Sequence, residues 1–148
     1  MIDDNYIKSN NTRLPEPTNK DALNRAKSLY KACREKAEIS GQDLQNLSNA
    51  VLSMFNMEAI PVKFAGKQPS NTRFKTLGIH KTNAFERSIQ VYKFTAKQKK
   101  VRSSKGSVDT LLHELTHEFD KMLLNISNSI HCSGFYNRIG QLVEWLNG

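Results

Sequence analysis

Apolar residues recur every three or four positions in four stretches of the chain, which predicts four helices. The first begins near Thr18 as its N-cap, and the second covers about residues 41–57. The third starts at Ser107 and ends near residue 124, and the last follows His131. Each of these helices has one apolar side, so we expect the four to pack around a common core.

The period changes between Ala59 and Lys100, where three short segments are predicted to be strands. They cover residues 60–64, 74–80 and 88–94, and the turn-forming residues between them separate one strand from the next. Three short strands joined in this way predict a small, mainly antiparallel sheet. The expected fold class is therefore α+β, with a small antiparallel β-sheet packed on helices.

Residues 1–17 are polar and end in Pro-Glu-Pro, so we expect an irregular N-terminal arm, either mobile or strapped over the domain. Residues 18–148 are then expected to be a single domain, because a chain of 148 residues suits one core. No apolar run approaches the ~20 residues of a membrane span, and the start of the chain lacks a secretion signal. The isolated Cys33 and Cys132 suit a reducing compartment. We expect a cytoplasmic protein, monomeric by default, with no membrane partner.

The net charge of +8 is unevenly distributed along the chain. Residues 61–105 contain twelve Lys or Arg against one acid, a net charge of +11, whereas the rest has ten bases and thirteen acids. Such a basic segment is either a solvated surface or a face for nucleic acid. DNA is therefore a candidate partner, and the bases that crowd before the third helix are candidate contacts: Lys97, Lys99, Lys100, Arg102 and Lys105.

The third predicted helix contains an H-E-x-x-H pattern formed by His113, Glu114 and His117. Residues four apart share a helix face, so the two imidazoles can meet at one divalent metal. Glu114 is rotated about 100° from His113, where it can flank the metal and take a proton from a metal-activated water. We predict a zinc site with Glu114 as the general base.

A catalytic zinc has three protein ligands, so the two helical histidines need a third donor. His131 is the best candidate, because it follows a loop that lets the chain turn back. Glu144 on the last helix and the thiol of Cys132 are the alternatives. His80, at the end of a predicted strand, is interpreted as a surface or hydrogen-bonded histidine rather than a ligand.

Three more polar residues could support this chemistry. Asp120 follows His117 by three residues and could orient its imidazole, unless it is simply an exposed acid. Tyr136 and Arg138 lie about one turn beyond His131, and either could donate to the oxyanion of a tetrahedral intermediate. Tyr136 is the second candidate catalytic residue, and a packed aromatic ring is its alternative role.

These motifs resemble a known family over about residues 60–146. The segment 76–92, the stretch Thr110–Asp120 with the H-E-x-x-H pattern, and His131 followed by Gly134-Phe135-Tyr136 are similar to the SprT-like zinc metallopeptidases. That family includes Spartan-type proteases of DNA–protein crosslinks and many small bacterial and phage proteins. In its better-known members glycine commonly follows the third histidine at once, whereas Cys132 and Ser133 intervene here.

The resemblance implies a zincin-like fold, zinc held by His113, His117 and His131, and Glu114 as the general base. The expected function is hydrolysis of peptide bonds in a protein or peptide substrate, with nucleic-acid-bound proteins as one class of target. The alternative is a nucleic-acid-associated binding module whose metal is structural or vestigial. The sequence contains neither a C-x-x-C zinc ribbon nor an appended DNA-binding tail, so the substrate stays open.

Overall fold

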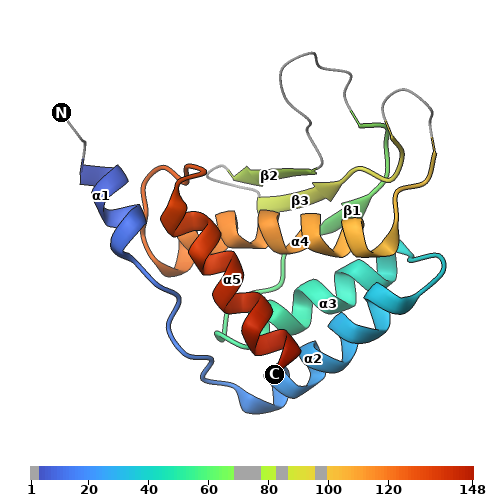
Figure 1. The fold of residues 1–148 in the computed structure, drawn as a ribbon, viewed down its shortest axis with the longest axis horizontal. Coiled ribbons are helices and arrows are strands. Elements are labelled where there is room, and N and C mark those ends of the chain that lie inside the picture. The colour runs from blue at the N-terminus through green and yellow to red at the C-terminus, as the bar shows by residue number, and fades with distance from the viewer. Residues whose placement is uncertain (1–3, 69–77, 83–86, 96–99) are drawn as a thin grey trace.

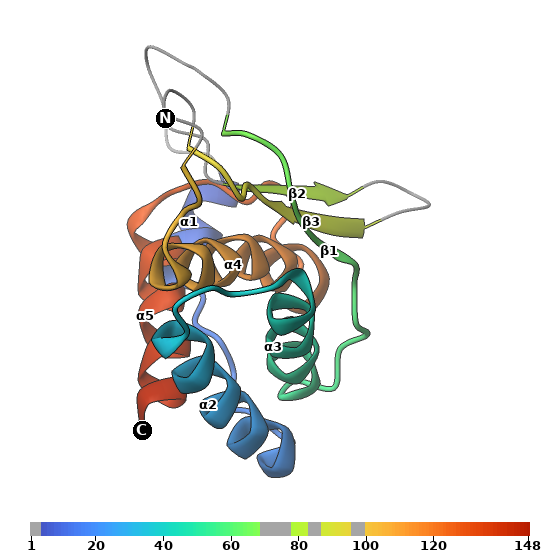
Figure 2. The ribbon, with the colours of Figure 1, turned by 90° about the vertical axis from the view of Figure 1, so that its right-hand side faces the viewer.

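Helix α4 (Ser104–Glu118) lies at the centre of the fold, between a small β-sheet and two other helices (Figure 1). The structure is a computed structural model, and it describes residues 4–68, 78–82, 87–95 and 100–148. Helices α2 (Lys20–Glu35) and α3 (Gly41–Ser53) cover one side of α4, and the sheet covers the opposite side (Figure 2). The class is α+β, as predicted.

The sheet is mixed, so the predicted antiparallel arrangement is wrong for one of its strands. Its order is β1 (Val62–Phe64), β3 (Arg87–Val91), β2 (Gly78–Thr82). Strands β2 and β3 are antiparallel, but β1 pairs with β3 in parallel, with Val62 opposite Ile89. Strand β2 itself runs back toward the starting end of the sheet, so β3 again has the direction of β1, and β3 lies between the two other strands. Apolar alternation locates strands but does not specify their neighbours.

The helix starts follow from local capping. Helix α2 begins with Asn19 as its N-cap, whose Oδ1 accepts a hydrogen bond from Ala22 N at 3.1 Å, so the predicted cap at Thr18 is one residue early. Ser40 and Asp43 form a reciprocal capping box at the start of α3. That helix ends at Ser53, before the predicted limit, and the chain then turns.

The apolar sides of the helices meet in one core around α4, as predicted. Its central side chains are almost completely buried and come from α3, α4, the following turn and β3: Leu44, Leu47, Leu52, Ile89, Leu111, Leu115 and Phe119. Helix α5 (Ser133–Asn147) packs against α2 and α4 and adds Leu142 and Leu146 to this core. In the part of the chain that is described, no helix combines the length and apolar character needed to cross a membrane.

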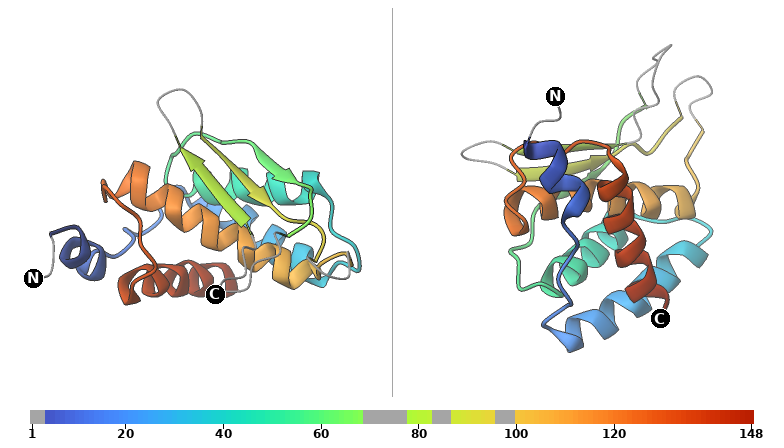
Figure 3. Two further views of the ribbon diagram at one scale, coloured as in Figure 1. Left: turned by 90° about the horizontal axis from the view of Figure 1, so that it is seen from above. Right: turned by 60° about the vertical axis from the view of Figure 1, so that its left-hand side comes forward.

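The N-terminal residues are more ordered than predicted. Residues 4–11 form helix α1 (Asp4–Asn11), so an irregular arm over 1–17 is wrong for this part. Helix α1 lies beside the start of α5, where Asn10 Oδ1 accepts a hydrogen bond from Gly134 N at 2.9 Å (Figure 3). The helix has no apolar stripe and is held by polar contacts, which explains why apolar spacing could not predict it.

Candidate metal centre

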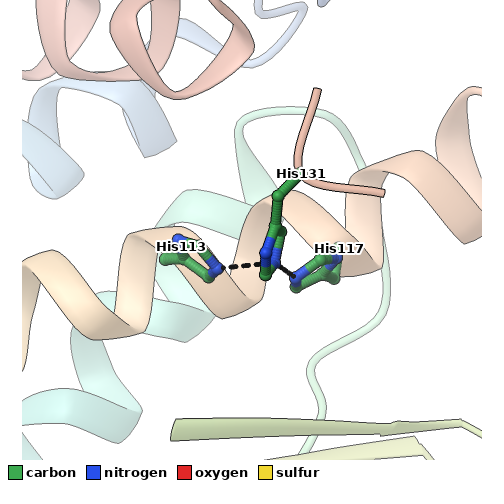
Figure 4. Close-up of side chains that lie close together, drawn as sticks. All are labelled: His113, His117 and His131. Atoms are coloured by element: carbon green, nitrogen blue, oxygen red, sulfur yellow. Dashed lines mark hydrogen bonds between the residues drawn. The ribbon is translucent and has the colours of Figure 1, made fainter. Parts of the chain in front are cut away.

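Three histidines converge at the carboxyl-terminal half of α4. His113 and His117 lie one turn apart on this helix, and His131 reaches them from the loop before α5 (Figure 4). His131 Nε2 is 3.1 Å from His113 Nε2 and 3.0 Å from His117 Nε2. The ligand atoms of all three residues lie within 4.8 Å of one another, so the group could hold a metal ion.

Hydrogen bonds alone do not satisfy this arrangement. An imidazole nitrogen carries either one proton or one lone pair, so His131 Nε2 cannot form a good hydrogen bond with two neighbours at once. A shared cation resolves the conflict, because all three lone pairs can point to it. Ligand nitrogens around tetrahedral zinc, each about 2.0–2.1 Å from the metal, are separated by roughly 3.3 Å. The donor set therefore fits a divalent metal of the zinc type, although imidazoles also suit copper, iron and nickel.

The protonation of the two helical histidines favours metal binding. Burial lowers the pKa of His113 to about 4, and the nearby His131 adds to the effect. Burial likewise lowers the pKa of His117 to about 3, with further contributions from the imidazoles around it. Both rings are therefore neutral near pH 7 and keep a lone pair available, which a metal ligand requires.

Asp120 supports His117 indirectly, through a serine that the sequence analysis missed. Ser129 Oγ donates to Asp120 Oδ2 at 2.7 Å and lies 2.7 Å from His117 Nδ1. Asp120 is fully buried in the π-helical turn η1 (Phe119–Leu123) that continues α4. The interpretation of Asp120 as an exposed acid is therefore wrong. No apolar period marks Ser129, which lies in a polar loop, so the sequence offered no signal for it.

Arg138 does not face the metal centre, so its predicted role as an oxyanion donor is wrong. Its side chain is completely buried and donates to both oxygens of Asp120, from Nε at 2.8 Å and from Nη2 at 3.0 Å. The remaining N–H groups donate to Ser9 and Thr12. All five guanidinium donors thus have acceptors away from the histidines.

Glu114 lies beside the histidines in a cavity of about 390 Å³, which His80, His117 and His131 also line. Its side chain is 6% exposed, and within the described residues its carboxylate accepts no hydrogen bond. Burial raises the pKa of Glu114 to about 7. A carboxylate with a pKa near neutrality is well matched to general-base chemistry, and a bound cation would lower that pKa.

His80 forms the wall opposite the helix and belongs to a buried ionic cluster. Its Nε2 lies 2.9 Å from Glu118 Oε1, and Glu118 Oε2 accepts from Arg87 Nε at 3.0 Å. Burial acts to raise the pKa of Glu118, but the hydrogen bonds from His80 and Arg87 outweigh it and lower that pKa. The interpretation of His80 as a hydrogen-bonded histidine is confirmed, although its ring also stacks on His117 with centroids 6.2 Å apart.

Two aromatic rings border the histidines from α5. Phe135 is completely buried, and its ring centroid lies 4.5–5.2 Å from those of the three imidazoles, so it forms an apolar wall. The ring of Tyr136 lies 6.3 Å from that of His113 and 6.2 Å from that of His131. Tyr136 is 52% exposed, so this ring lies on the solvent side of the histidine group.

The alternative third ligands lie outside the group of histidines. Glu144 is exposed on the last turns of α5. The thiol of Cys132 is 3.1 Å from Ser9 Oγ, on the side where α1 docks. Among the residues that the structure describes, His131 alone joins His113 and His117.

The described members of the predicted basic rim, Lys100, Arg102 and Lys105, do not line the cavity. Lys97 and Lys99 fall outside the described residues. Arg102 donates to Tyr92 O, Gly106 O and Thr110 Oγ1, so its guanidinium helps to anchor the start of α4. Lys100 and Lys105 are exposed, and neither lines the histidine cavity. The reason is geometric: Lys100 and Arg102 precede α4 and Lys105 lies in its first turn, whereas the histidines occupy its far half.

Comparison with models of protein families, with curated proteins and with solved structures gave no match to this chain.

Proposed function

We propose that the protein is a zinc-dependent peptidase with a zincin-like arrangement, similar to the SprT-like metallopeptidases. The observation that carries the proposal is the convergence of three imidazole Nε2 atoms, 3.0 and 3.1 Å apart, next to a buried carboxylate. Three histidines would supply the ligands, and three protein ligands are the donor set of catalytic rather than structural zinc. Glu114 shares their cavity and supplies the base.

Each residue of the site has a separate role in the proposed peptide hydrolysis. A divalent cation held by the histidines would supply Lewis-acid polarisation and would make water in the site more acidic. Glu114 takes the proton from the attacking water and delivers it to the leaving amine. Phe135 excludes solvent from one side of the imidazoles. The role proposed for Tyr136, whose ring lies 6.2 Å from that of His131, is to donate its hydroxyl to the developing oxyanion of a bound substrate.

The test measures zinc content and cleavage of a loosely folded protein such as casein with the full chain. Glu114→Gln is expected to retain zinc and to lose cleavage by at least about two orders of magnitude, the usual worth of a general base. Glu144→Gln is the matched control, because that carboxylate is exposed on α5 and should leave cleavage unchanged. Wild-type cleavage by Glu114→Gln would reject the mechanism.

A second candidate function, binding of nucleic acid, is favoured by a basic cavity elsewhere. A cavity of about 600 Å³ is lined by bases from α2 and the first turn of α4, together with the end of α5: Lys27, Lys31, Arg34 and Lys105. Arg34 pairs with Asp109, and Glu35 also lines the cavity, so its positive charge comes from three lysines against one acid. Anionic ligands such as DNA would be drawn to this surface.

This second candidate is tested by DNA affinity at increasing salt. Replacing Lys27, Lys31 and Lys105 together with alanine should weaken DNA binding and make its salt dependence shallower. Lys63→Ala, at an exposed base on β1, is the control. If the wild-type protein shows no salt-dependent affinity for DNA, the binding module is excluded, and the peptidase can be tested without DNA.

A further inference from the structure

We propose that residues 9–12 of the N-terminal segment act as positioning residues of the metal centre. Through Arg138, Asp120 and Ser129, they would set the orientation and tautomer of His117. The proposal rests on the metal site proposed above, and it adds positioning residues that lie outside the ligand set.

The Ser129 hydroxyl lies between Asp120 and His117 and has a single proton to donate. An ionised carboxylate only accepts hydrogen bonds, so the Ser129 hydroxyl must donate its single proton to Asp120 Oδ2. Ser129 Oγ also lies 2.7 Å from His117 Nδ1. Because its proton is already donated to Asp120, this oxygen can only accept a hydrogen bond from His117. The proton of His117 is therefore held on Nδ1, and the lone pair stays on Nε2, the atom that faces His113 and His131.

Asp120 is held in place by Arg138. A completely buried carboxylate needs compensating charge, and Arg138 supplies it through two hydrogen bonds to the two oxygens. This bidentate geometry fixes the plane of the carboxylate and, with it, the position of Oδ2 that receives the Ser129 hydroxyl. An Asp120 without Arg138 could rotate, and Ser129 would lose its direction.

Arg138 is held in turn by the N-terminal segment. Of the five N–H donors of Arg138, three donate to residues 9–12: Nη1 to Ser9 O and to Thr12 O, and Nη2 to Ser9 Oγ. Close packing keeps this segment in place, because a Cβ atom at Gly134 would collide with Ser9 O and lie 2.6 Å from Asn10 Cα. Only glycine allows the segment to approach α5 this closely.

These hydrogen bonds thus form one continuous network from Ser9 through Arg138, Asp120 and Ser129 to His117. Ser9 is completely buried at the joint, although α1 as a whole is polar and exposed. If the segment lifts away, Arg138 is left with three buried donors and no acceptor, and it must either move or admit water. Either response disturbs the carboxylate that fixes His117.

The decisive variants change Ser129 in the full chain. Ser129→Ala removes the acceptor of His117 Nδ1–H, and zinc affinity, measured by competition with a chelator, should fall about 10- to 100-fold. The visible spectrum of the Co²⁺-substituted protein should change, while the melting temperature of the metal-free protein changes little. Ser129→Thr keeps the hydroxyl and should restore both readouts. Wild-type affinity and spectrum in Ser129→Ala would overturn the proposal.

The N-terminal link is tested with Gly134→Ala and the milder Asn10→Ala, which removes the acceptor for Gly134 N and Ser133 Oγ. Both should weaken zinc binding and alter the Co²⁺ spectrum. Gly140→Ala is the matched control on the same helix, because a Cβ atom there meets nothing within 4 Å. If Asn10→Ala folds and binds zinc as the wild type does, the N-terminal segment has no role in the site.

These readouts separate the proposal from the peptidase function. A wild-type protein that binds zinc but cleaves nothing, with weakened binding in Ser129→Ala, would reject the peptidase and leave the positioning chain intact. If Ser129→Ala changes neither cleavage nor zinc binding, the positioning role is rejected and the peptidase function is retained. A wild-type chain that binds neither zinc nor Co²⁺ overturns both.

Discussion

A Cβ atom at Gly78 would lie 3.1 Å from Glu114 Cγ, so the backbone of strand β2 packs closely against the Glu114 side chain. The same atom would meet Thr110 Cγ2 at 2.8 Å, a separation that real side chains do not tolerate. The glycine therefore sets the distance between the sheet and α4 at the point where Glu114 projects into the cavity.

Gly78→Ala is expected to reduce cleavage while zinc binding persists, because the added methyl group pushes β2 or Glu114 aside without touching the ligands. Overpacking of this kind typically costs about 1–3 kcal/mol, which a denaturant titration would measure. Gly140→Ala again provides the comparison, since its Cβ atom enters open space. Wild-type turnover in Gly78→Ala would show that the position of β2 does not constrain the base.

His131→Ala should lower zinc affinity strongly while the metal-free protein stays folded. His131 is exposed, so little packing is lost, but one of three ligands disappears. Elemental analysis after dialysis against a weak chelator would report the loss of stoichiometry. Glu144→Ala should retain a full equivalent of zinc, and the opposite result for these two variants would make Glu144 the third ligand.

The metal-free protein should lose stability as the pH falls below 6.5 because of its two helical histidines. Their pKa values are depressed to about 4 for His113 and about 3 for His117, whereas the unfolded chain titrates near 6.5. Between these values the unfolded chain binds more protons, so protonation favours unfolding. Glu114 acts in the opposite sense, since its pKa of about 7 lies above the unfolded value of 4.5.

The two contributions can be separated with one variant. In Glu114→Gln only the histidines remain, so the free energy of unfolding should drop more steeply between pH 7 and pH 5 than in the wild type. Urea titrations in the presence of a chelator would measure the two slopes. Equal slopes would mean that the buried carboxyl group titrates normally.

Asp120→Ala should destabilise the fold by about 3–5 kcal/mol, because it leaves the completely buried Arg138 without its countercharge. Thermal or denaturant unfolding of the metal-free protein would record this change. Asp109 offers the comparison: it pairs with Arg34 but is 59% exposed, and such surface pairs contribute about 0–1 kcal/mol. Similar losses in Asp120→Ala and Asp109→Ala would contradict the assignment of Asp120 to a buried network.

The helical part of the metal site was predictable because it is local. His113 and His117 are four residues apart, so helix geometry alone brings them together. His131 could be proposed from the loop before it, but its contact with both imidazoles depends on how α5 packs. The same spacing arguments located most of the core, since apolar periodicity directly reports which helix faces are buried.

The supporting residues were not predictable, because their role depends on contacts between distant parts of the chain. Arg138 lies on a helix whose apolar stripe it interrupts, and nothing in the spacing shows that it is buried rather than exposed. Its acceptors come from α1, a helix without an apolar face, and Ser129 lies in a polar loop. The parallel pairing of β1 with β3 escaped prediction for a related reason, because the pattern of a strand does not specify its neighbour.

The hydrogen bond between Arg138 and Ser9 joins residues separated by 129 positions, so it can form only late in synthesis of the chain. A nascent chain exposes its amino end first, and domains fold as their residues emerge from the ribosome. The three histidines are synthesised before Arg138. The hydrogen bonds that link Ser9 to His117 can therefore form only after Arg138 has emerged. An interrupted translation product that ends before Arg138 would therefore contain all three histidines of the candidate metal centre and still lack the hydrogen bonds that orient His117.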